Sequence, residues 1–261
     1  MREIVIYFTI YSFLGWVAET IYCFIIDKKF TYRGFLYGPV CPIYGFGGVI
    51  VIKFLHGIGN NPIKVFLGGM ILASVLEYIT SYVLEKLFHM KWWDYSTYKF
   101  NINGRVCLKN SIFFGLLALF IVEILEPMLR DSVSSIPSSI IYPVSTIIII
   151  IFIIDLTFTV AHLIHLKEHL DRLKNIKGDL KELNIEFKQF TEAEFEKIKM
   201  EIATRKNNGQ NIDMLNKVMI KLDSLKNEAK QNKRVLKAFP HAKYNKEHTH
   251  FKELKNLIDN K

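Results

Sequence analysis

Long apolar runs fill the first two thirds of the chain and predict membrane-spanning helices. Each run approaches the roughly 20 residues that an α-helix needs to cross the hydrocarbon core of a bilayer. The alternation of apolar and polar residues that is typical of a β-barrel is not seen. The runs cover residues 4–26, 35–55, 65–88, 111–129 and 140–166. The pattern therefore predicts an all-α membrane protein with about five transmembrane helices.

The second run is less regular than the others. Gly38, Pro39, Pro42 and Gly45 interrupt it, and proline removes a helical hydrogen-bond donor. Broken backbone at membrane depth is tolerated only where protein surrounds it or where it lines a cavity. We expect either a kinked span or a partly re-entrant segment, in which these four residues act as structural or hinge positions.

Beyond residue 166 the pattern changes to charged helix formers with a narrow apolar stripe. Leucines recur there at three- and four-residue steps, so the last span is expected to continue as an amphipathic helix. Thr191 and Glu194 form a capping-box pattern that begins a further helix, and the Asn207-Asn208-Gly209 sequence ends it. A last helix is expected to run to Pro240. The sequence thus predicts a transmembrane domain at 1–166 and a charged helical, partly coiled-coil-like tail at 167–261.

The distribution of charge supports this division and gives an orientation. The chain has 261 residues with 34 Lys and Arg against 25 Asp and Glu; the first 166 residues hold 12 basic and 10 acidic side chains, the tail 22 and 15. If the tail is inside, eight basic residues flank the spans on that side and four on the other. Because the cytoplasmic side keeps the excess of Lys and Arg, we expect the N-terminus outside and the C-terminus in the cytoplasm.

Acidic side chains within the apolar runs are the main functional signal. An ionised carboxylate is costly at the centre of a bilayer, so such a residue indicates a functional site unless it serves packing. The acids are Glu19, Glu77, Glu85, Glu123 and Asp155. Glu77 and Glu85 share a helical stripe with Ser74 and Ser81. Three interpretations stay open: hydrogen bonding between helices, a path for a ligand or ion, and catalysis.

Charged and aromatic loop residues on the predicted inner side extend this signal. Arg33 precedes the broken second run, and Asp94 and Arg105 lie in the loop after the third run. Trp92, Trp93 and other aromatics there are also typical interfacial anchors, so simple loop packing is the alternative. The candidate polar cavity consists of Glu19, Arg33, Glu77, Glu85, Asp94 and Arg105.

Several common activities have no motif in the sequence. A Walker loop, a Gly-x-Ser-x-Gly elbow, a His-Glu-x-x-His helix and a Cys-x-x-Cys pair are all missing, so nothing supports ATP hydrolysis by the chain itself or a familiar catalytic site. We expect no metal and no cofactor, because His162, His165 and His169 have no matching ligand. The tail's mixed charges favour anionic lipid over nucleic acid.

The same residues carry a resemblance to a bacterial integral-membrane family, the putative ABC-transporter type IV family, also called CmpB-like or putative ABC transporter permease. The resemblance is strong from about Tyr7 to Phe120 and looser beyond. Its motifs are Phe13-Leu14-Gly15-Trp16 with Glu19, Arg33 through Pro39 with Pro42-Ile43-Tyr44-Gly45, Leu76-Glu77-Tyr78 with Ser81-Tyr82 and Glu85 through Phe88, and Trp92 through Ser96 with Asn103-Gly104-Arg105. It implies a multi-pass protein of the bacterial cytoplasmic (inner) membrane with transport as its function.

Three functions are compatible with these features. The leading hypothesis is a permease component whose second and third spans line a substrate path. Such a component would need a separate ATP-binding subunit or an ion gradient, or would have only a passive role. A membrane-embedded enzyme acting on a lipid or amphiphile is the second, although the missing motifs make an enzyme the weaker expectation. The third is a non-catalytic anchor whose tail recruits a cytoplasmic protein. The lipid bilayer is the expected surrounding, and a homo-oligomer stays open.

Overall fold

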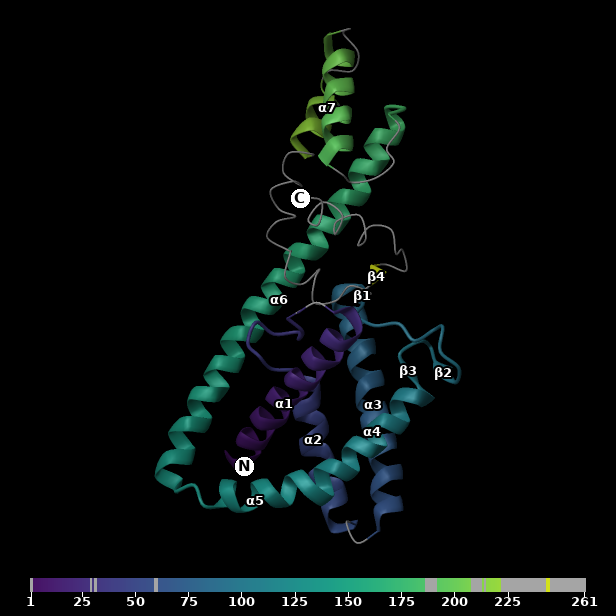
Figure 1. Ribbon diagram of the computed structural model, residues 1–261. Helices are drawn as coiled ribbons and strands as arrows, with labels where there is room; N and C mark the ends of the chain where they lie inside the picture. The colour runs from purple at the N-terminus through teal and green to yellow at the C-terminus, as the bar shows by residue number, and fades with distance from the viewer. Residues whose placement is uncertain are drawn as a thin grey trace. The chain divides into compact units, whose positions relative to one another are not determined.

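The computed structural model describes residues 2–28, 30, 32–58, 61–185, 192–207, 213, 215–221 and 243–244. The described chain is mostly helical (Figure 1). Its elements are α1 (Arg2–Asp27), α2 (Pro42–Leu55), η1 (His56–Ile58), α3 (Pro62–Phe88), β1 (Met90–Lys91), β2 (Asn101–Ile102), β3 (Val106–Cys107), α4 (Leu108–Phe120), η2 (Ile121–Leu125), α5 (Glu126–Ser134), α6 (Ser138–Glu182), α7 (Glu192–Asn207) and β4 (Lys243–Tyr244). The chain forms two compact units. The first consists of Met1–Leu87 and Trp92–Val160, and the second consists of Phe88–Lys91 and Ala161–Lys261.

Four helices among the described residues are long and apolar enough to cross a membrane. They cover Arg2–Ile25, Pro62–Phe88, Leu108–Ser134 and Ser138–Leu166, and a shorter apolar helix covers Pro42–Ile58. The chain is therefore a multi-pass membrane protein, as the apolar runs predict. Only 11–28% of the most apolar window of each long helix is buried within the protein, as expected of surfaces that lipid covers.

The second apolar run forms a helix only in its C-terminal part. Residues 32–41 are not helical, and α2 begins at Pro42, a residue whose fixed backbone angle suits the first helical position. The 14 residues of α2 span about 21 Å, less than the roughly 30 Å of a hydrocarbon core. The predicted break is thus observed at the glycine and proline positions, and α2 with the non-helical segment before it replaces one regular helix.

Helices α1 and α2 pack antiparallel through glycines. An added Cβ at Gly45 would lie 2.2 Å from Ser12 Oγ, and one at Gly48 would lie 2.6 Å from the Tyr11 ring. A Cβ at Gly15 of α1 would meet the Tyr44 ring of α2 at 2.3 Å. The absence of side chains at these points lets the two backbones approach closely, as in many membrane helix pairs.

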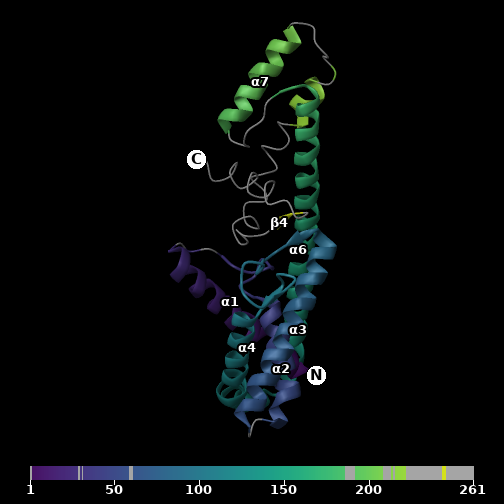
Figure 2. The same ribbon diagram turned by 90° about the vertical axis from the view of Figure 1, so that its right-hand side faces the viewer.

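Helix α3 contacts both α2 and α4 through its own glycines. A Cβ at Gly68 would meet Leu55 at 2.7 Å, and one at Gly69 would meet Ala118 at 2.1 Å. Figure 2 shows α2 and α3 side by side, as Figure 1 does from the other direction. The apolar core at this end of the first unit consists of Tyr11, Val51, Leu55, Val65, Ala118, Ile121 and Val122.

The fourth span is one continuous helix with an irregular turn. Its central part, η2, is a π-helical turn between α4 and α5. Pro127 follows directly in the first turn of α5, and a proline cannot donate to the carbonyl four residues earlier. The widened turn accommodates that missing hydrogen bond.

Helix α6 continues well past the membrane span, as the sequence predicts. It has 45 residues, about 68 Å of helix, and only 11% of its most apolar window is buried. In the second unit, α7 covers the predicted helix, while its capping Thr191 and the stretch from 222 to 240 lie outside the described residues.

Hydrogen bonds join the described helical parts of the tail. Arg205 of α7 donates to the backbone oxygen of Leu183 at 2.5 Å, and Lys221 donates to Asp179 of α6 at 2.6 Å. The side chains of Leu180, Ile198, Ile202, Leu215 and Val218 are buried. The expected coiled-coil character of the tail stays a prediction.

Candidate functional site

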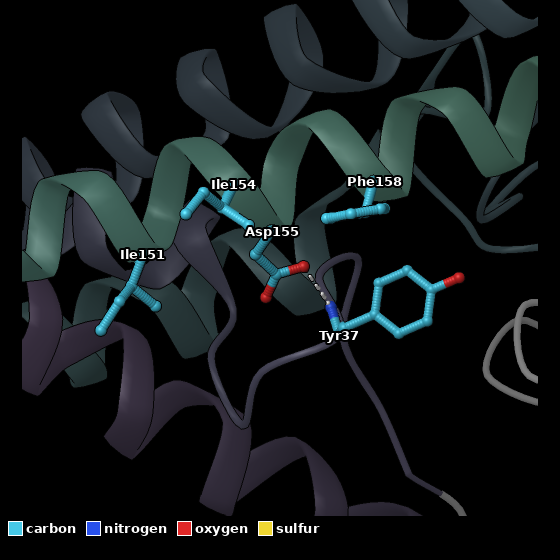
Figure 3. A pocket seen from close by; sticks show the side chains of 5 residues that line it. All are labelled: Tyr37, Ile151, Ile154, Asp155 and Phe158. Carbon is cyan, nitrogen blue, oxygen red and sulfur yellow. Dashed lines mark hydrogen bonds between the residues drawn. The ribbon is translucent and has the colours of Figure 1, made fainter.

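A non-helical segment, residues 32–41, lies alongside the middle of two spans. The Cys41 N–H donates to the backbone oxygen of Ser12 in α1 at 2.8 Å. Asp155, near the middle of the α6 span, accepts hydrogen bonds from the backbone N–H groups of Tyr37 at 2.8 Å and Gly38 at 2.7 Å. Figure 3 shows the Asp155 carboxylate pointing at the Tyr37 N–H, beside an open pocket lined by Ile151, Ile154 and Phe158. Asp155, an acid within a predicted span, thus accepts hydrogen bonds from the backbone of segment 32–41.

A second non-helical segment, residues 92–107, runs along the C-terminal half of α3. Ser74 Oγ donates to Ser111 Oγ at 2.7 Å, which places the first turn of α4 beside the middle of α3. Closer to the C-terminus of α3, Asn103 donates to the Tyr78 hydroxyl at 2.8 Å. The loop that the sequence places at the membrane surface therefore covers the polar stripe of α3.

The two segments meet, and two tyrosines close to them bind intramembrane carboxylates. The Trp92 ring packs edge-on against Phe35 at 5.6 Å between ring centroids. The Tyr44 hydroxyl, in the first turn of α2, donates to Glu19 at 2.6 Å. The Tyr95 hydroxyl, in segment 92–107, donates to Glu77 at 3.3 Å. Glu19 and Glu77 thus come from different helices, and each is bound by a tyrosine.

Electrostatics show that these groups are neighbours. Burial raises the pKa of Tyr95, and the Glu77 and Glu19 carboxylates raise it further. The buried Cys41 thiol is close enough to Glu19 and Arg33 to feel the charge of both. The structure therefore brings together three of the six predicted site residues, Glu19, Arg33 and Glu77.

Several buried polar atoms near this group have hydrogen-bonding capacity that the described residues do not use. They include Ser12 Oγ, Thr20 Oγ1 and Trp16 Nε1 on α1 and Glu77 Oε2 on α3. Only 6% of Glu77 is exposed. Buried polar atoms nearly always have a partner, so an unmatched set indicates water, an ion or a ligand. We refer to Glu19, Tyr44, Glu77 and Tyr95, with these atoms, as the central polar cluster.

Glu85 and Arg105 form a separate group. Arg105 donates to Glu85 at 2.5 Å, and its guanidinium lies 5.4 Å from the Tyr78 ring centroid and 5.3 Å from that of Tyr82. Glu85 is eight residues after Glu77 on α3, about 12 Å along the helix. Both acids have a hydrogen-bond partner within the protein, and the two partners differ.

The other predicted positions have local structural roles. Asp94 accepts the Ser96 N–H at 3.0 Å within segment 92–107. Gly38 is held by Asp155, Pro42 begins α2, and Gly45 allows contact with α1. Pro39 follows Gly38 in the same extended segment. These glycine and proline residues shape one broken segment, and their role as hinges stays a prediction.

Sequence reasoning missed three features. Tyr44 and Tyr95 were not singled out, because tyrosines near a membrane surface are common. Glu126, of which 5% is exposed, pairs with Arg130 at 2.8 Å and lies 3.6 Å from His56 at the opposite end of α2. The i,i+4 spacing of Glu126 and Arg130 is a signal that could have revealed this pair.

The described residues include no group of three or more His, Cys, Asp or Glu side chains placed to hold a metal ion. The model of the family described as Putative ABC-transporter type IV matches residues 6–160. This match includes every residue of the central polar cluster and both broken segments. No curated protein and no solved structure matches the chain.

Proposed function

Because the chain belongs to the Putative ABC-transporter type IV family, we propose that it is the membrane-spanning permease component of a transporter. In this proposal the central polar cluster contacts a polar solute on its way across the membrane. The observation that carries the proposal is the meeting of two non-helical segments at Glu19 and Glu77, beside the middle of the spans.

Non-helical backbone beside the middle of the spans is unfavourable in free energy, and a binding role would explain why the protein retains it. Backbone that leaves the helix needs new hydrogen-bond partners in a bilayer. Here Asp155 and Ser12 provide partners for segment 32–41, whereas regular helices would need none. Discontinuous elements near the bilayer midplane commonly form substrate sites of transporters.

The composition of the cluster favours a neutral or cationic polar solute. Two carboxylates and two tyrosines supply mainly acceptors and hydroxyl groups, and Arg33 is the neighbouring positive charge. A bound solute would satisfy Glu77 Oε2 and the unmatched donors of α1. The six residues predicted from the sequence remain the proposed site set, with Glu85 and Arg105 as its outer pair.

The energy source would be a separate chain. A Walker loop is missing from the sequence, so ATP hydrolysis requires an ATP-binding subunit. We propose that the charged tail beyond residue 166 lies in the cytoplasm of a bacterial cell and offers the contact surface for this subunit. The orientation follows the excess of basic residues next to the spans on that side.

Cysteine accessibility tests the path without knowledge of the solute. The variants Ser81→Cys and Ile79→Cys are made in a background with Cys23, Cys41 and Cys107 replaced by alanine. Native membranes that contain each variant are then treated with a cationic, water-soluble methanethiosulfonate reagent. Ser81 lies buried on the polar stripe of α3, while 53% of Ile79 is exposed on the apolar side. We expect Ser81→Cys to react and Ile79→Cys to stay unmodified, because the path admits water and lipid does not.

A second measurement tests whether the modification of Ser81→Cys depends on the central polar cluster. Glu77→Gln removes the charge but keeps the size, so it should slow the modification of Ser81→Cys by the cationic reagent more than that by an uncharged one. If Ser81→Cys resists both reagents in membranes, the polar stripe serves helix packing and the permease proposal is wrong.

A further inference from the structure

An apolar groove opens on the outer surface of the first unit, away from the central polar cluster. It has a volume of about 410 Å³. Its three walls are α3, segment 92–107 and the start of α4. The lining residues are Met70, Ile71, Ser74, Val75, Phe100, Ile102, Val106, Cys107, Leu108 and Ser111.

The groove presents hydrocarbon and no free polar group from its two serines. Ser74 Oγ donates to Ser111 Oγ, and Ser111 Oγ donates to the backbone oxygen of Cys107 at 3.1 Å. Both hydroxyl protons are therefore used within the wall. A polar ligand would find no donor from these serines, whereas an acyl chain needs none.

Two apolar side chains of the hairpin region are exposed at the groove. Phe100 has a φ of +53°, a conformation uncommon for non-glycine residues, and 79% of it is exposed. Its backbone oxygen accepts the Leu108 N–H at 3.2 Å. Ile102 of β2 also lines the groove and is exposed. The hairpin of β2 and β3 thus adds an apolar wall to the groove beside the two helices.

Basic side chains lie next to the hairpin end of the groove. Lys109 follows the lining residue Leu108, and its ammonium group lies 5.8 Å from the centroid of the Tyr98 ring. Lys99 precedes the lining residue Phe100, and both lysines are exposed. The other end of the groove, at Met70, lies deeper along α3 and carries no charge. Charge at one end and hydrocarbon along the length match the chemistry of an anionic lipid.

We propose that this groove binds one acyl chain of an anionic phospholipid, with the lipid phosphate at Lys109 and Lys99. The chain runs from the hairpin along α3 toward Met70. Its binding covers the apolar hairpin residues and stabilises segment 92–107, whose inner side carries Tyr95 and Arg105. The inference is independent of the solute that the permease carries.

The test uses the full-length protein in nanodiscs of equal phosphatidylglycerol and phosphatidylcholine, followed by release into mild detergent and native mass spectrometry. Val75→Trp fills the groove. Val83→Trp is the matched control, because Val83 is also exposed on α3 but lies outside the groove. We expect the unaltered protein and Val83→Trp to retain one phosphatidylglycerol, and Val75→Trp to lose it. Ile71→Trp, which also fills the groove, repeats the test if Val75→Trp does not fold.

A second pair of variants tests the phosphate contact. Lys109→Gln should lower the preference for phosphatidylglycerol over phosphatidylcholine by about fivefold, the effect of one basic residue on an anionic headgroup. Lys64→Gln, at the other end of α3, should leave the preference unchanged. Glycerol phosphate, added in excess, should not displace the lipid, because it lacks the chain.

The proposal is overturned by any of three results: equal retention of both lipids by the unaltered protein, equal loss in the Val75→Trp and Val83→Trp variants, or displacement by glycerol phosphate. In the last case the lysines alone form a phosphate site.

Discussion

Glu85 and Arg105 show how a charge pair is accommodated beside an apolar helix. Exposure of their side chains is 25% and 13%, and two tyrosine rings flank the guanidinium. The rings keep water away from two sides of the guanidinium and hold this planar group in place. A lysine ammonium group is not planar and would gain less from the same ring contacts. The pair joins segment 92–107 to α3, so its strength bears on the fold of the whole site.

A double-mutant cycle measures this strength. Removing one partner of a fully buried pair costs several kcal/mol; for this partly exposed pair we expect Glu85→Gln to lower the free energy of unfolding by about 1–3 kcal/mol. Arg105→Gln should cost more, because the ring contacts are lost too. The double variant should cost less than the sum by at least about 1 kcal/mol. Denaturant unfolding in detergent gives all three values, and additive losses would contradict the pairing.

At the scale of elements, α1, α2 and α3 are held by glycine contacts, and the broken segments by single polar anchors. Asp155 joins α6 to segment 32–41 across more than one hundred residues of sequence. Helix α6 is otherwise largely exposed along its span. The Asp155 carboxylate therefore adds a directional contact between this span and segment 32–41, since apolar side chains alone provide little directional preference.

Glycine substitution on α2 tests the close packing. At Gly45 a methyl group would overlap Ser12 Oγ and approach the Phe8 backbone oxygen at 2.7 Å; at Gly47 the nearest atom would be Leu76 Cδ2 at an ordinary 3.7 Å. Gly45→Ala should therefore reduce stability by about 1–3 kcal/mol through overpacking. Gly47→Ala should be neutral or slightly stabilising, because alanine favours the helix. Thermal unfolding of both variants in one detergent provides the comparison, and equal melting temperatures would contradict the close approach of α1 and α2.

At the scale of the whole molecule, the short helix α2 decides the number of crossings. Its end is fixed near α5, because Arg130 donates to His56 at 2.8 Å. Its start lies beside Glu19, in the other half of α1. Segment 32–41 and α2 together can thus complete a crossing that 14 helical residues alone do not span.

Reporter fusions test the resulting topology of five crossings. We expect a reporter that is active outside the cytoplasm to work after Ile58 and after Ser135, and a cytoplasm-active reporter to work after Lys261. The first two positions follow from the contact between His56 and Arg130, which puts α2 and α5 at one end of the first unit. A cytoplasm-active reporter after Ile58 would mean that the second run is re-entrant and does not cross.

The sequence by itself determined the local features of this protein. Apolar length and helical periodicity fixed the long spans, the break at Gly38 and Pro39, and the polar stripe from Ser74 to Glu85, because each depends on neighbours within a few turns. The continuation of the last span and the bounds of α7 followed from the same rules. Family motifs in residues 6–160 also required no structure.

Only the tertiary structure decided which of these features meet. Periodicity states which face of a helix is polar, but the partner of that face depends on the path of loops and on packing between segments far apart in sequence. Tyr44 with Glu19, Tyr95 with Glu77, and Asp155 with the Gly38 backbone could not be paired in advance. The loop after α3 covers the polar side of that helix, because its Tyr95 hydroxyl and Arg105 guanidinium bind the Glu77 and Glu85 carboxylates.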